Sequence, residues 1–377
     1  MRFSTKLIHN ASTIDPATGA ASPPIHHAST FHQDPANGAA RFVYSRSKNP
    51  TRSILEDTIA ELEEGIAGFA FASGMAAIAA VLMLFSSGDH LIVAKDLYGG
   101  TDQILKQLSQ RFGLEVTYVD MTDLVNVASQ IGPRTRAIYI ETPSNPTLTI
   151  TDLRAIGALA AQHHLVTIAD NTFMSPYLQQ PLKLGLDIVI HSATKFLAGH
   201  SDVIAGLVVV NSPAIKTQLE QIQVTWGAIL GPDDSWLTIR GIKTLAIRLD
   251  RAQSNAMTLA QFLSHHPLVN RVYYPGLFTH SQKSLHESQA LGPGAVLSFE
   301  LDPQLPVKEF VSRLHYAIYA VSLGGVETIV SHPATMSHAK MAPIDRQAIG
   351  VTDQLLRISA GIEDVDDLIE DFQQALF

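Results

Sequence analysis

From about residue 53 onward, short apolar runs alternate with stretches of helical periodicity, and this alternation constrains the fold more than any other feature of the chain. A helical stretch, Ser53–Glu64, is followed by the first apolar run, Gly68–Ala72, and a buried helical stretch, Met75–Phe85. Strands that alternate with helices indicate an α/β domain with a mostly parallel sheet covered on both faces. The later expected strands are His90–Ala94, Glu115–Val119, Ala137–Glu141, Val166–Ala169, Ile188–Ile190 and Gly206–Val210, with helices such as Asp152–His163 between most of them.

The chain is expected to divide into three parts. Residues 1–47 are rich in Ser, Thr, Pro, Ala and Asn and show weak periodicity, which predicts an extended arm that needs another surface to pack on. Residues 48–240 form the expected large domain, and residues 241–377 a smaller α+β domain. A long helical pattern from Ser235 to His265 is expected to bridge the two. The small domain should contain the strands Arg271–Tyr274, Ala295–Glu300 and Leu355–Ser359 and the helices Val307–Leu314 and Val365–Leu376.

Composition excludes several classes of protein. A hydrophobic content of 46% supports a large core, while a formal net charge of -9 argues against nucleic-acid or anionic-membrane partners. The chain has no cysteine, so disulfides, thiolate metal sites and cysteine nucleophiles are absent. Neither the N-terminus nor the longest apolar stretch, residues 76–85, reads as a signal peptide or a membrane span, so a cytoplasmic protein is expected. The paired histidines lack useful metal spacing, and we expect no metal site.

The candidate site follows from the sheet. In an open α/β sheet, ligands bind beyond the carboxyl ends of the strands. The segments at those positions are polar or rich in glycine, and they should converge on one edge. They are Ser73–Met75, Lys95–Gly99, Glu141–Asn145, Asp170–Phe173 and His191–Lys195.

Three of these segments carry specific chemistry, although each also has an ordinary alternative. Gly74 lies where a helix N-terminus could bind a phosphate, but Ser73 could be a simple helix cap. Asp170 could hold a protonated ring nitrogen, or it could be a turn residue. Lys195 could form an imine, with Ser192 and Thr194 as phosphate ligands, although a single lysine is most often solvated at the surface. Together they supply the three things that pyridoxal phosphate requires of a protein.

Seven motifs then connect these residues to a known family. They are Tyr44-Ser45-Arg46 with Asn49-Pro50-Thr51, Ser73-Gly74-Met75-Ala76, Tyr98-Gly99-Gly100-Thr101, Glu141-Thr142-Pro143-Ser144-Asn145-Pro146, Asp170-Asn171-Thr172-Phe173, His191-Ser192-Ala193-Thr194-Lys195 and Ser322-Leu323-Gly324-Gly325. Over nearly its whole length the sequence resembles the Cys/Met-metabolism pyridoxal phosphate enzymes, which include cystathionine γ-lyase, cystathionine β-lyase, methionine γ-lyase and cystathionine γ-synthase. The resemblance implies the α/β fold of the type I pyridoxal phosphate-dependent transferases.

The resemblance also implies residue roles. Lys195 would carry the cofactor as a Schiff base and move protons, Asp170 would hold the ring nitrogen, and Tyr98 would stack on the ring and help to deprotonate the incoming amine. Arg357 would bind the substrate carboxylate. The implied cofactor-binding residues are Ser73, Gly74, Met75, Tyr98, Asp170, Thr172, Ser192, Thr194 and Lys195, with Tyr44 and Arg46 from a neighbouring subunit. The implied substrate-binding residues are Arg357, Asn145, Ser322, Tyr98 and Tyr44. A shared site implies at least a dimer, and the family is usually a tetramer made of two such dimers.

Within this family the sequence narrows the reaction only partly. Gly100 stands where typical methionine γ-lyases carry a reactive cysteine, which disfavours that activity. Val43 and Val321 stand where some γ-lyases carry acidic residues that could hold the distal ammonium of cystathionine. We therefore expect a cystathionine lyase with mixed β- and γ-elimination, with cystathionine γ-synthase as the alternative. Glu141 remains open as either a structural carboxylate or part of the site's hydrogen-bond network.

Two other classes of protein fit less well. A nucleotide-dependent oxidoreductase would carry Gly-x-Gly-x-x-Gly after an early strand, and no such motif occurs here. A non-catalytic scaffold would not need the set of Lys195, Asp170, Tyr98 and Arg357.

Overall fold

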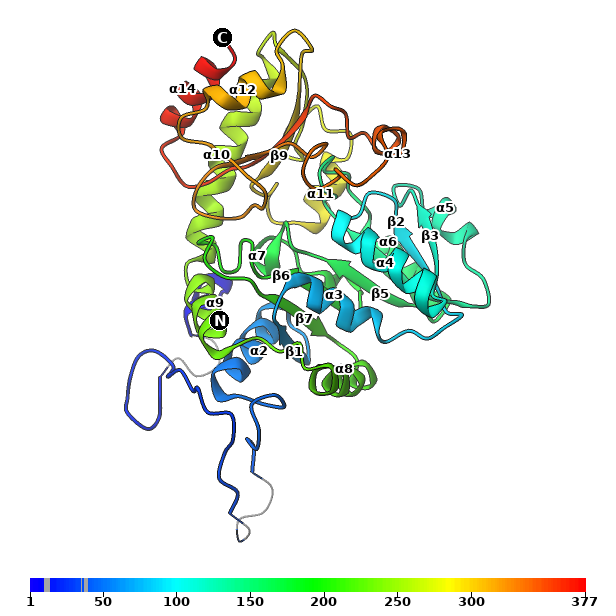
Figure 1. The fold of residues 1–377 in the computed structure, drawn as a ribbon, viewed down its shortest axis with the longest axis vertical. Helices are drawn as coiled ribbons and strands as arrows, with labels where there is room; N and C mark the ends of the chain where they lie inside the picture. The colour runs from blue at the N-terminus through cyan, green and yellow to red at the C-terminus, as the bar shows by residue number, and fades with distance from the viewer. Residues whose placement is uncertain (10–13, 35, 37–39) are drawn as a thin grey trace.

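A computed structural model describes residues 1–9, 14–34, 36 and 40–377 of the chain. It has a large α/β domain, a smaller C-terminal domain beside it, and an N-terminal segment that extends away from both (Figure 1). Within the described residues, no helix is long and apolar enough to cross a membrane.

The large domain is built on a seven-stranded sheet with the order β1-β7-β6-β5-β4-β2-β3. Six strands point in one direction, as the alternation predicts, whereas β7 runs the opposite way and pairs antiparallel with both β1 and β6. The direction of β7 follows from its connection, because the segment between β6 and β7 contains no helix to carry the chain back across the sheet. The strands are β1 (Ala67–Phe71), β2 (His90–Ala94), β3 (Glu115–Val119), β4 (Thr135–Glu141), β5 (Val166–Asp170), β6 (Ile188–Ser192) and β7 (Gly206–Val210).

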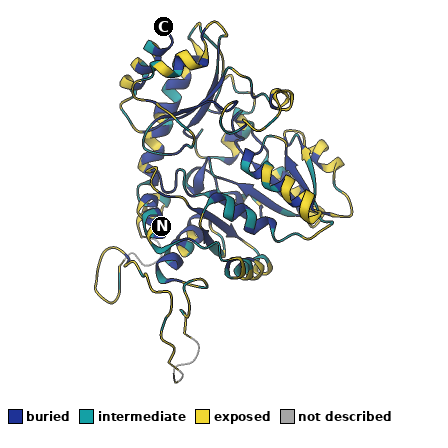
Figure 2. Ribbon diagram, viewed as in Figure 1, coloured by how far each residue is buried: buried dark blue, intermediate teal, exposed yellow. Residues whose placement is uncertain are grey.

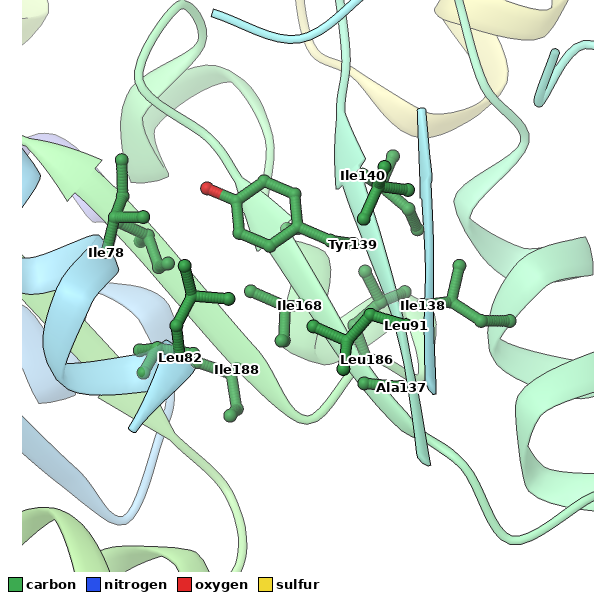
Figure 3. Packing of buried hydrophobic residues seen from close by; sticks show 14 of the residues in the cluster. Ile78, Leu82, Leu91, Ala137, Ile138, Tyr139, Ile140, Ile168, Leu186 and Ile188 are labelled. Carbon is green, nitrogen blue, oxygen red and sulfur yellow. The ribbon is translucent and has the colours of Figure 1, made fainter. Parts of the chain in front are cut away.

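Helices cover both faces of this sheet, which is why its strands are apolar along nearly their whole length (Figure 2). Alternate residues of β6 show the two layers: Ile188 and Ile190 belong to the core beneath α3, and Val189 to the core beneath α2. Tyr139 lies in the first layer among aliphatic side chains (Figure 3). The helices are α2 (Pro50–Glu63), α3 (Gly74–Leu82), α4 (Gly99–Phe112), α5 (Leu124–Ser129), α6 (Leu153–Gln162), α7 (Ser175–Leu178), α8 (Pro213–Trp226) and a short 3₁₀ helix (Pro181–Leu184).

The helical pattern expected from Ser235 to His265 is two helices, α9 (Pro232–Ile242) and α10 (Leu245–Ser264). The expected helical pattern is therefore present but divided by a break between Ile242 and Leu245. Arg248 explains the break: its Nη2 donates to the Gly241 carbonyl at 2.8 Å, so this oxygen is satisfied by a side chain where the helix ends. Leu249, in the first half of α10, packs in the large-domain core, and Leu259, in the second half, packs in the core of the small domain. The bridging position expected of this segment therefore belongs to α10.

The small domain contains a five-stranded sheet with the order β10-β11-β12-β9-β8, with α12 and α14 beside it (Figure 1). The three expected strands and two expected helices are present, whereas two short strands and two short helices had no periodic pattern to reveal them. The elements are β8 (Val269–Tyr273), α11 (Lys283–Gln289), β9 (Val296–Leu301), α12 (Val307–Arg313), β10 (Ile318–Tyr319), β11 (Ile329–Ser331), α13 (Pro343–Ala348), β12 (Leu355–Ser359) and α14 (Val365–Ala375).

The N-terminal arm is only partly extended. It begins with a short helix, α1 (Phe3–His9), which packs on its own chain through the buried Leu7. This helix was not predicted, because its seven residues are too few to show a periodic pattern. The rest of the described arm is mostly exposed and projects from the body of the molecule (Figures 1 and 2). Arg52 anchors its base, because this buried guanidinium donates to the carbonyls of Ser45 and Ser47 at 2.7 and 2.9 Å.

Candidate active site

A cavity of about 580 Å³ lies where the carboxyl ends of the large-sheet strands meet the small domain. It is lined by nearly all the site residues that the sequence predicts, which come from strand tips and loops far apart in the chain. These are Ser73, Gly74, Met75, Tyr98, Asn145, Asp170, Thr172, Ser192, Thr194, Lys195, Ser322 and Arg357. The position agrees with the rule that an open α/β sheet binds ligands at this edge.

One wall of the cavity is suited to an anion. Helix α3 begins at Gly74, and the Ser73 hydroxyl accepts the Ala76 N–H at 3.1 Å, so Ser73 is a helix cap and the helix start also faces the cavity. A side chain on Gly74 would place its Cβ only 2.9 Å from the Cβ of Ser192. Glycine is therefore required for α3 to approach the tip of β6 this closely. The N-terminal amides of the helix and the polar tip of the strand together form a cradle for a phosphate.

Lys195 lies on the loop that follows β6, and its Nζ donates to the Ser322 Oγ at 2.5 Å. Burial, together with the positive charge of Arg357, lowers the pKa of Lys195 to about 8. The amine is thus far more available as a nucleophile near neutral pH than a surface lysine would be. The solvated-lysine alternative is excluded by this burial.

The loop that carries Ser322 passes directly over Lys195. Gly324, with φ of +80°, would place a Cβ 2.6 Å from the Phe196 backbone nitrogen, so only glycine fits there. Ser322 itself has φ of +85°, a conformation that side chains disfavour. The small domain therefore holds its serine against the lysine at some conformational cost.

Asp170 ends β5 with its side chain in the cavity. Burial raises the pKa of this carboxyl group, while the Thr172 hydroxyl and backbone N–H oppose the rise. The Thr172 N–H donates to Asp170 Oδ1 at 3.1 Å, and the Thr172 hydroxyl accepts the Ser192 N–H at 2.8 Å. Thr172 thereby links the aspartate to the strand that leads to Lys195.

Glu141 belongs to the hydrogen-bond network of the cavity, which settles the question left open by its sequence. It lies beside Asp170 in the register of β4 and β5 and lines the cavity. Its Oε2 accepts the backbone N–H of Tyr98 at 2.7 Å, so it fixes the loop that carries the tyrosine. Burial and the nearby Asp170 raise the pKa of Glu141 well above its ordinary value.

Arg357 projects from β12 of the small domain and is buried. Its Nη1 donates to Asn145 Oδ1 at 3.0 Å, and its Nη2 donates to the Ser322 carbonyl at 2.6 Å. Burial lowers the pKa of the guanidinium to about 10, so it remains a cation at neutral pH. A buried cation without a carboxylate partner among its hydrogen bonds is suited to binding a carboxylate ligand.

Tyr98 is exposed toward the open cavity, as a residue that stacks on a ligand would be. Tyr44 and Arg46, by contrast, do not line the cavity of their own chain. They lie on the exposed arm, with the Arg46 guanidinium carbon 5.7 Å from the centre of the Tyr44 ring. The structure therefore brings together every predicted site residue except these two.

Several cavity residues were missed by the sequence reasoning. Ser331, Met336 and Ser337 line the cavity from β11 and the loop that follows it, and Ile204 lines it from the loop before β7. None of them sits in a glycine-rich or polar strand-end motif, so only the folded arrangement of the two domains reveals them. Two of them, Ile204 and Met336, add apolar surface to the cavity.

The residues of the cavity fit pyridoxal phosphate. They provide an anion cradle at Gly74, a reactive amine at Lys195 and a carboxyl group at Asp170, within a volume typical of sites for small ligands. Among the described residues, no group of three or more His, Asp or Glu side chains could hold a metal ion.

Comparisons with known proteins agree with this chemistry. A family model described as "Cys/Met metabolism PLP-dependent enzyme" matches residues 4–377. Cystathionine β-lyase MetC of Bacillus subtilis (strain 168) is 54% identical over 372 residues, which cover 99% of this chain and 95% of that protein. Cystathionine γ-lyase of the same organism is 48% identical over 376 residues, covering 100% and 99%. The crystal structure of cystathionine γ-lyase from Lactobacillus plantarum, complexed with L-serine, has a TM-score of 0.97 at 47% identity and covers 100% of this chain and 98% of that one.

Proposed function

The chain belongs to the Cys/Met metabolism family of enzymes dependent on pyridoxal phosphate, and from this premise we propose that it is a carbon–sulfur lyase acting on cystathionine. Its products would be a thiol amino acid, a 2-oxo acid and ammonia. One contact supports the proposal most directly. The Ser322 hydroxyl accepts from Lys195 while the Ser322 carbonyl accepts from Arg357, so the reactive amine and the carboxylate-binding cation are fixed to one residue.

In this proposal, each part of the cofactor would be held by a different group of cavity residues. The amides of Gly74 and Met75, with Ser73, Ser192 and Thr194, would bind the phosphate. Asp170, supported by Thr172, would hold the ring nitrogen, and Tyr98 would contact the ring. When bound, pyridoxal phosphate supplies an electron sink that stabilises the charge left on a substrate carbon after proton removal.

The chain's own residues then bind and deprotonate the substrate. Arg357 binds the α-carboxylate by a two-pronged contact, with Asn145 and Ser322 fixing the orientation of the guanidinium. Lys195 removes the proton from the α-carbon, because its lowered pKa makes it a base near neutral pH. For β-elimination, Lys195 then returns a proton to the departing sulfur. For γ-elimination, its Nζ must also take a proton from Cβ.

Both eliminations fit the entrance of the cavity. Val321 lines the cavity and is 65% exposed, and Val43 on the arm is 51% exposed. Neither valine can form an ion pair with the distal ammonium of cystathionine. These two positions therefore do not hold the substrate in a single orientation that would favour one elimination. We therefore propose mixed β- and γ-elimination, with γ-synthase activity on an activated homoserine ester as the second candidate.

Product analysis tests the proposal. The protein reconstituted with pyridoxal phosphate is incubated with cystathionine, and the products are identified by mass spectrometry. Homocysteine with pyruvate would report β-elimination, and cysteine with 2-oxobutyrate would report γ-elimination. If cystathionine is not cleaved but forms from cysteine and O-succinylhomoserine, the enzyme is a synthase. A protein that stays colourless with added pyridoxal phosphate would contradict the cofactor assignment.

The exposed arm supports a further part of the proposal. We propose that residues 1–47 act largely between subunits, with Tyr44 and Arg46 reaching the phosphate in a neighbouring chain, and that residues 48–240 and 241–377 form the cofactor and substrate domains. The exposure of Tyr44, at 44%, supports this reading. A homotetramer made of two such dimers would follow from the family's usual assembly. We propose separately that the enzyme acts in the cytoplasm.

A further inference from the structure

A buried ionisable pair lies behind the cavity, and the mechanism above makes no use of it. Glu63 is the last residue of α2 and is 0% exposed, while His191 on β6 is 1% exposed. The Glu63 Oε1 lies 2.6 Å from the His191 Nε2. The same oxygen accepts the Asn171 Nδ2 at 3.2 Å. The two residues that contact the Glu63 carboxylate, Asn171 and His191, thus lie at the carboxyl ends of β5 and β6. The same strand ends carry the proposed cofactor residues on the face of the sheet that borders the cavity.

The position of Glu63 is unfavourable for a negative charge. The C-terminal end of a helix is the negative end of its dipole, and full burial removes the water that would otherwise solvate the carboxylate. A buried ion pair is often no more stable than well-packed apolar side chains of similar size. The pair of Glu63 and His191 is therefore poorly explained by stability alone.

The pair lies close to Asp170 through the sheet. In the parallel register of β5 and β6, Asp170 pairs with Ile190, the neighbour of His191. Successive side chains of a strand point to opposite faces, so His191 turns away from the cavity while Asp170 points into it. Burial raises the pKa of Asp170, and the positive charge of His191 acts in the opposite direction.

The cations Lys195 and Arg357 line the same cavity, but His191 is the charge that lowers the pKa of Asp170. The neighbouring ionisable groups on β4, Glu141 and Tyr139, carry only negative charge when they ionise, and the charge of Asp170 raises the pKa of both. An ionised Asp170 is nevertheless what a protonated ring nitrogen requires. The positive charge that acts on Asp170 therefore comes from His191 on the far face of the sheet.

We propose that His191, paired with the buried carboxylate of Glu63, is a positioning residue that holds Asp170 ionised and so favours the protonated ring nitrogen of the cofactor. It acts through the electric field across the sheet and touches neither cofactor nor substrate. The inference rests on the role proposed above for Asp170. Within the described residues, Glu63 is the one hydrogen-bond partner of the imidazole, so Glu63 is the residue through which the pair can be tested.

The test replaces Glu63 by its neutral isostere. Apoprotein of wild type and of Glu63→Gln is titrated with pyridoxal phosphate and with its deaza analogue, in which carbon replaces the ring nitrogen. An opposite charge within a few ångströms is worth about one to three pKa units. We therefore expect Glu63→Gln to bind pyridoxal phosphate about tenfold more weakly than wild type does. The two proteins should bind the deaza analogue with affinities that agree within about twofold.

The matched control disturbs the same buried layer without removing a charge. Gln179 is buried and its Nε2 donates to Asn171 Oδ1 at 3.0 Å, so Gln179→Met removes a hydrogen bond next to the pair. This variant should unfold at a lower temperature, and any change in its affinity should be the same for both cofactors. Should Glu63→Gln not fold, the double variant Glu63→Gln/His191→Gln, with two amides in place of the ion pair, takes its place in the same comparison.

The outcomes separate the possibilities. If Glu63→Gln weakens the affinity for pyridoxal phosphate but not for the deaza analogue, the proposal is supported. If the variant loses the same affinity for both ligands, or loses affinity for neither, the proposal is overturned and the pair of Glu63 and His191 has only a structural role. Failure of the wild-type protein to bind pyridoxal phosphate at all would instead overturn the proposed function, so the two claims fail in different ways.

Discussion

The two walls of the cavity are built in different ways. The large-domain wall consists of strand tips and a helix start, supported by a sheet whose central strands are buried, and it carries Asp170 and Lys195. The small-domain wall consists mainly of loops around Ser322 and Ser337, with Ser331 and Arg357 projecting from the strands β11 and β12. The rigid wall presents groups suited to the cofactor, and the loop-built wall presents groups suited to a variable substrate. Substitutions in the two walls should therefore differ in whether cofactor affinity or substrate affinity is lost.

The largest effect is expected at Lys195, where the two walls meet. Lys195→Ala removes the base that takes the α-proton, so kcat should fall by at least about 10⁴-fold. Steady-state assays with cystathionine measure this loss, and absorbance spectra report whether the cofactor is still bound. Residual activity within about tenfold of wild type would show that another group serves as the base.

Arg357 provides the clearest test of the small-domain wall. Arg357→Ala removes a buried cation that would bind the substrate carboxylate, so kcat/KM should fall by about 10²–10³-fold while the affinity for pyridoxal phosphate stays unchanged. Arg357→Lys is the matched control, because it keeps the positive charge but cannot make the bidentate contact of a guanidinium. Its decrease in kcat/KM should therefore be smaller. A parallel loss of cofactor affinity would break the distinction between the two walls.

The lowered pKa of Lys195 predicts a pH dependence that belongs to the large-domain wall. Below its pKa of about 8 the amine is protonated and unreactive toward the cofactor aldehyde. The rate at which apoprotein takes up pyridoxal phosphate should therefore drop about tenfold per pH unit below 8 and level off above it. Stopped-flow absorbance between pH 6 and 9 measures this profile, and a flat profile would contradict the assignment.

The arm extends the comparison to a third element. If Arg46 reaches the phosphate of a neighbouring subunit, Arg46→Ala should weaken the binding of pyridoxal phosphate by about tenfold, although Arg46 lies outside the cavity of its own chain. Equilibrium titration of the apoprotein measures the affinity. Arg41→Ala, a neighbouring arm variant, should leave it unchanged. Equal affinities for Arg46→Ala and wild type would count against a shared site.

The smallest effect is expected at the entrance. Val321→Glu places a carboxylate near the distal end of the substrate, where it could hold the ammonium of cystathionine. The site is 65% exposed, so the pair would contribute at most about 1 kcal/mol. The ratio of 2-oxobutyrate to pyruvate should rise by about threefold, and Val321→Gln should leave it unchanged. An unaltered ratio in the glutamate variant would show that these positions do not set the reaction.

The sequence predicted the large-domain wall well and the small-domain wall incompletely. The alternation of apolar runs and helical stretches places Asp170 and Lys195 at strand ends, because parallel strands present their carboxyl ends to one edge. No such rule orders the loops of the small domain, so Ser331, Met336 and Ser337 were not predicted. The break between α9 and α10 was also missed, because it depends on a hydrogen bond from Arg248 to Gly241.

The sequence by itself determined the family and its cofactor, and it named the residues proposed to bind that cofactor, since these follow from local motifs and their order along the chain. Only the tertiary structure decided how those residues act on one another. The amine of Lys195 becomes reactive because folding buries it beneath Ser322 and beside Arg357, which come from the other domain. Burial and the field of distant charges set the ionisation of such groups, and neither quantity exists until the chain has folded.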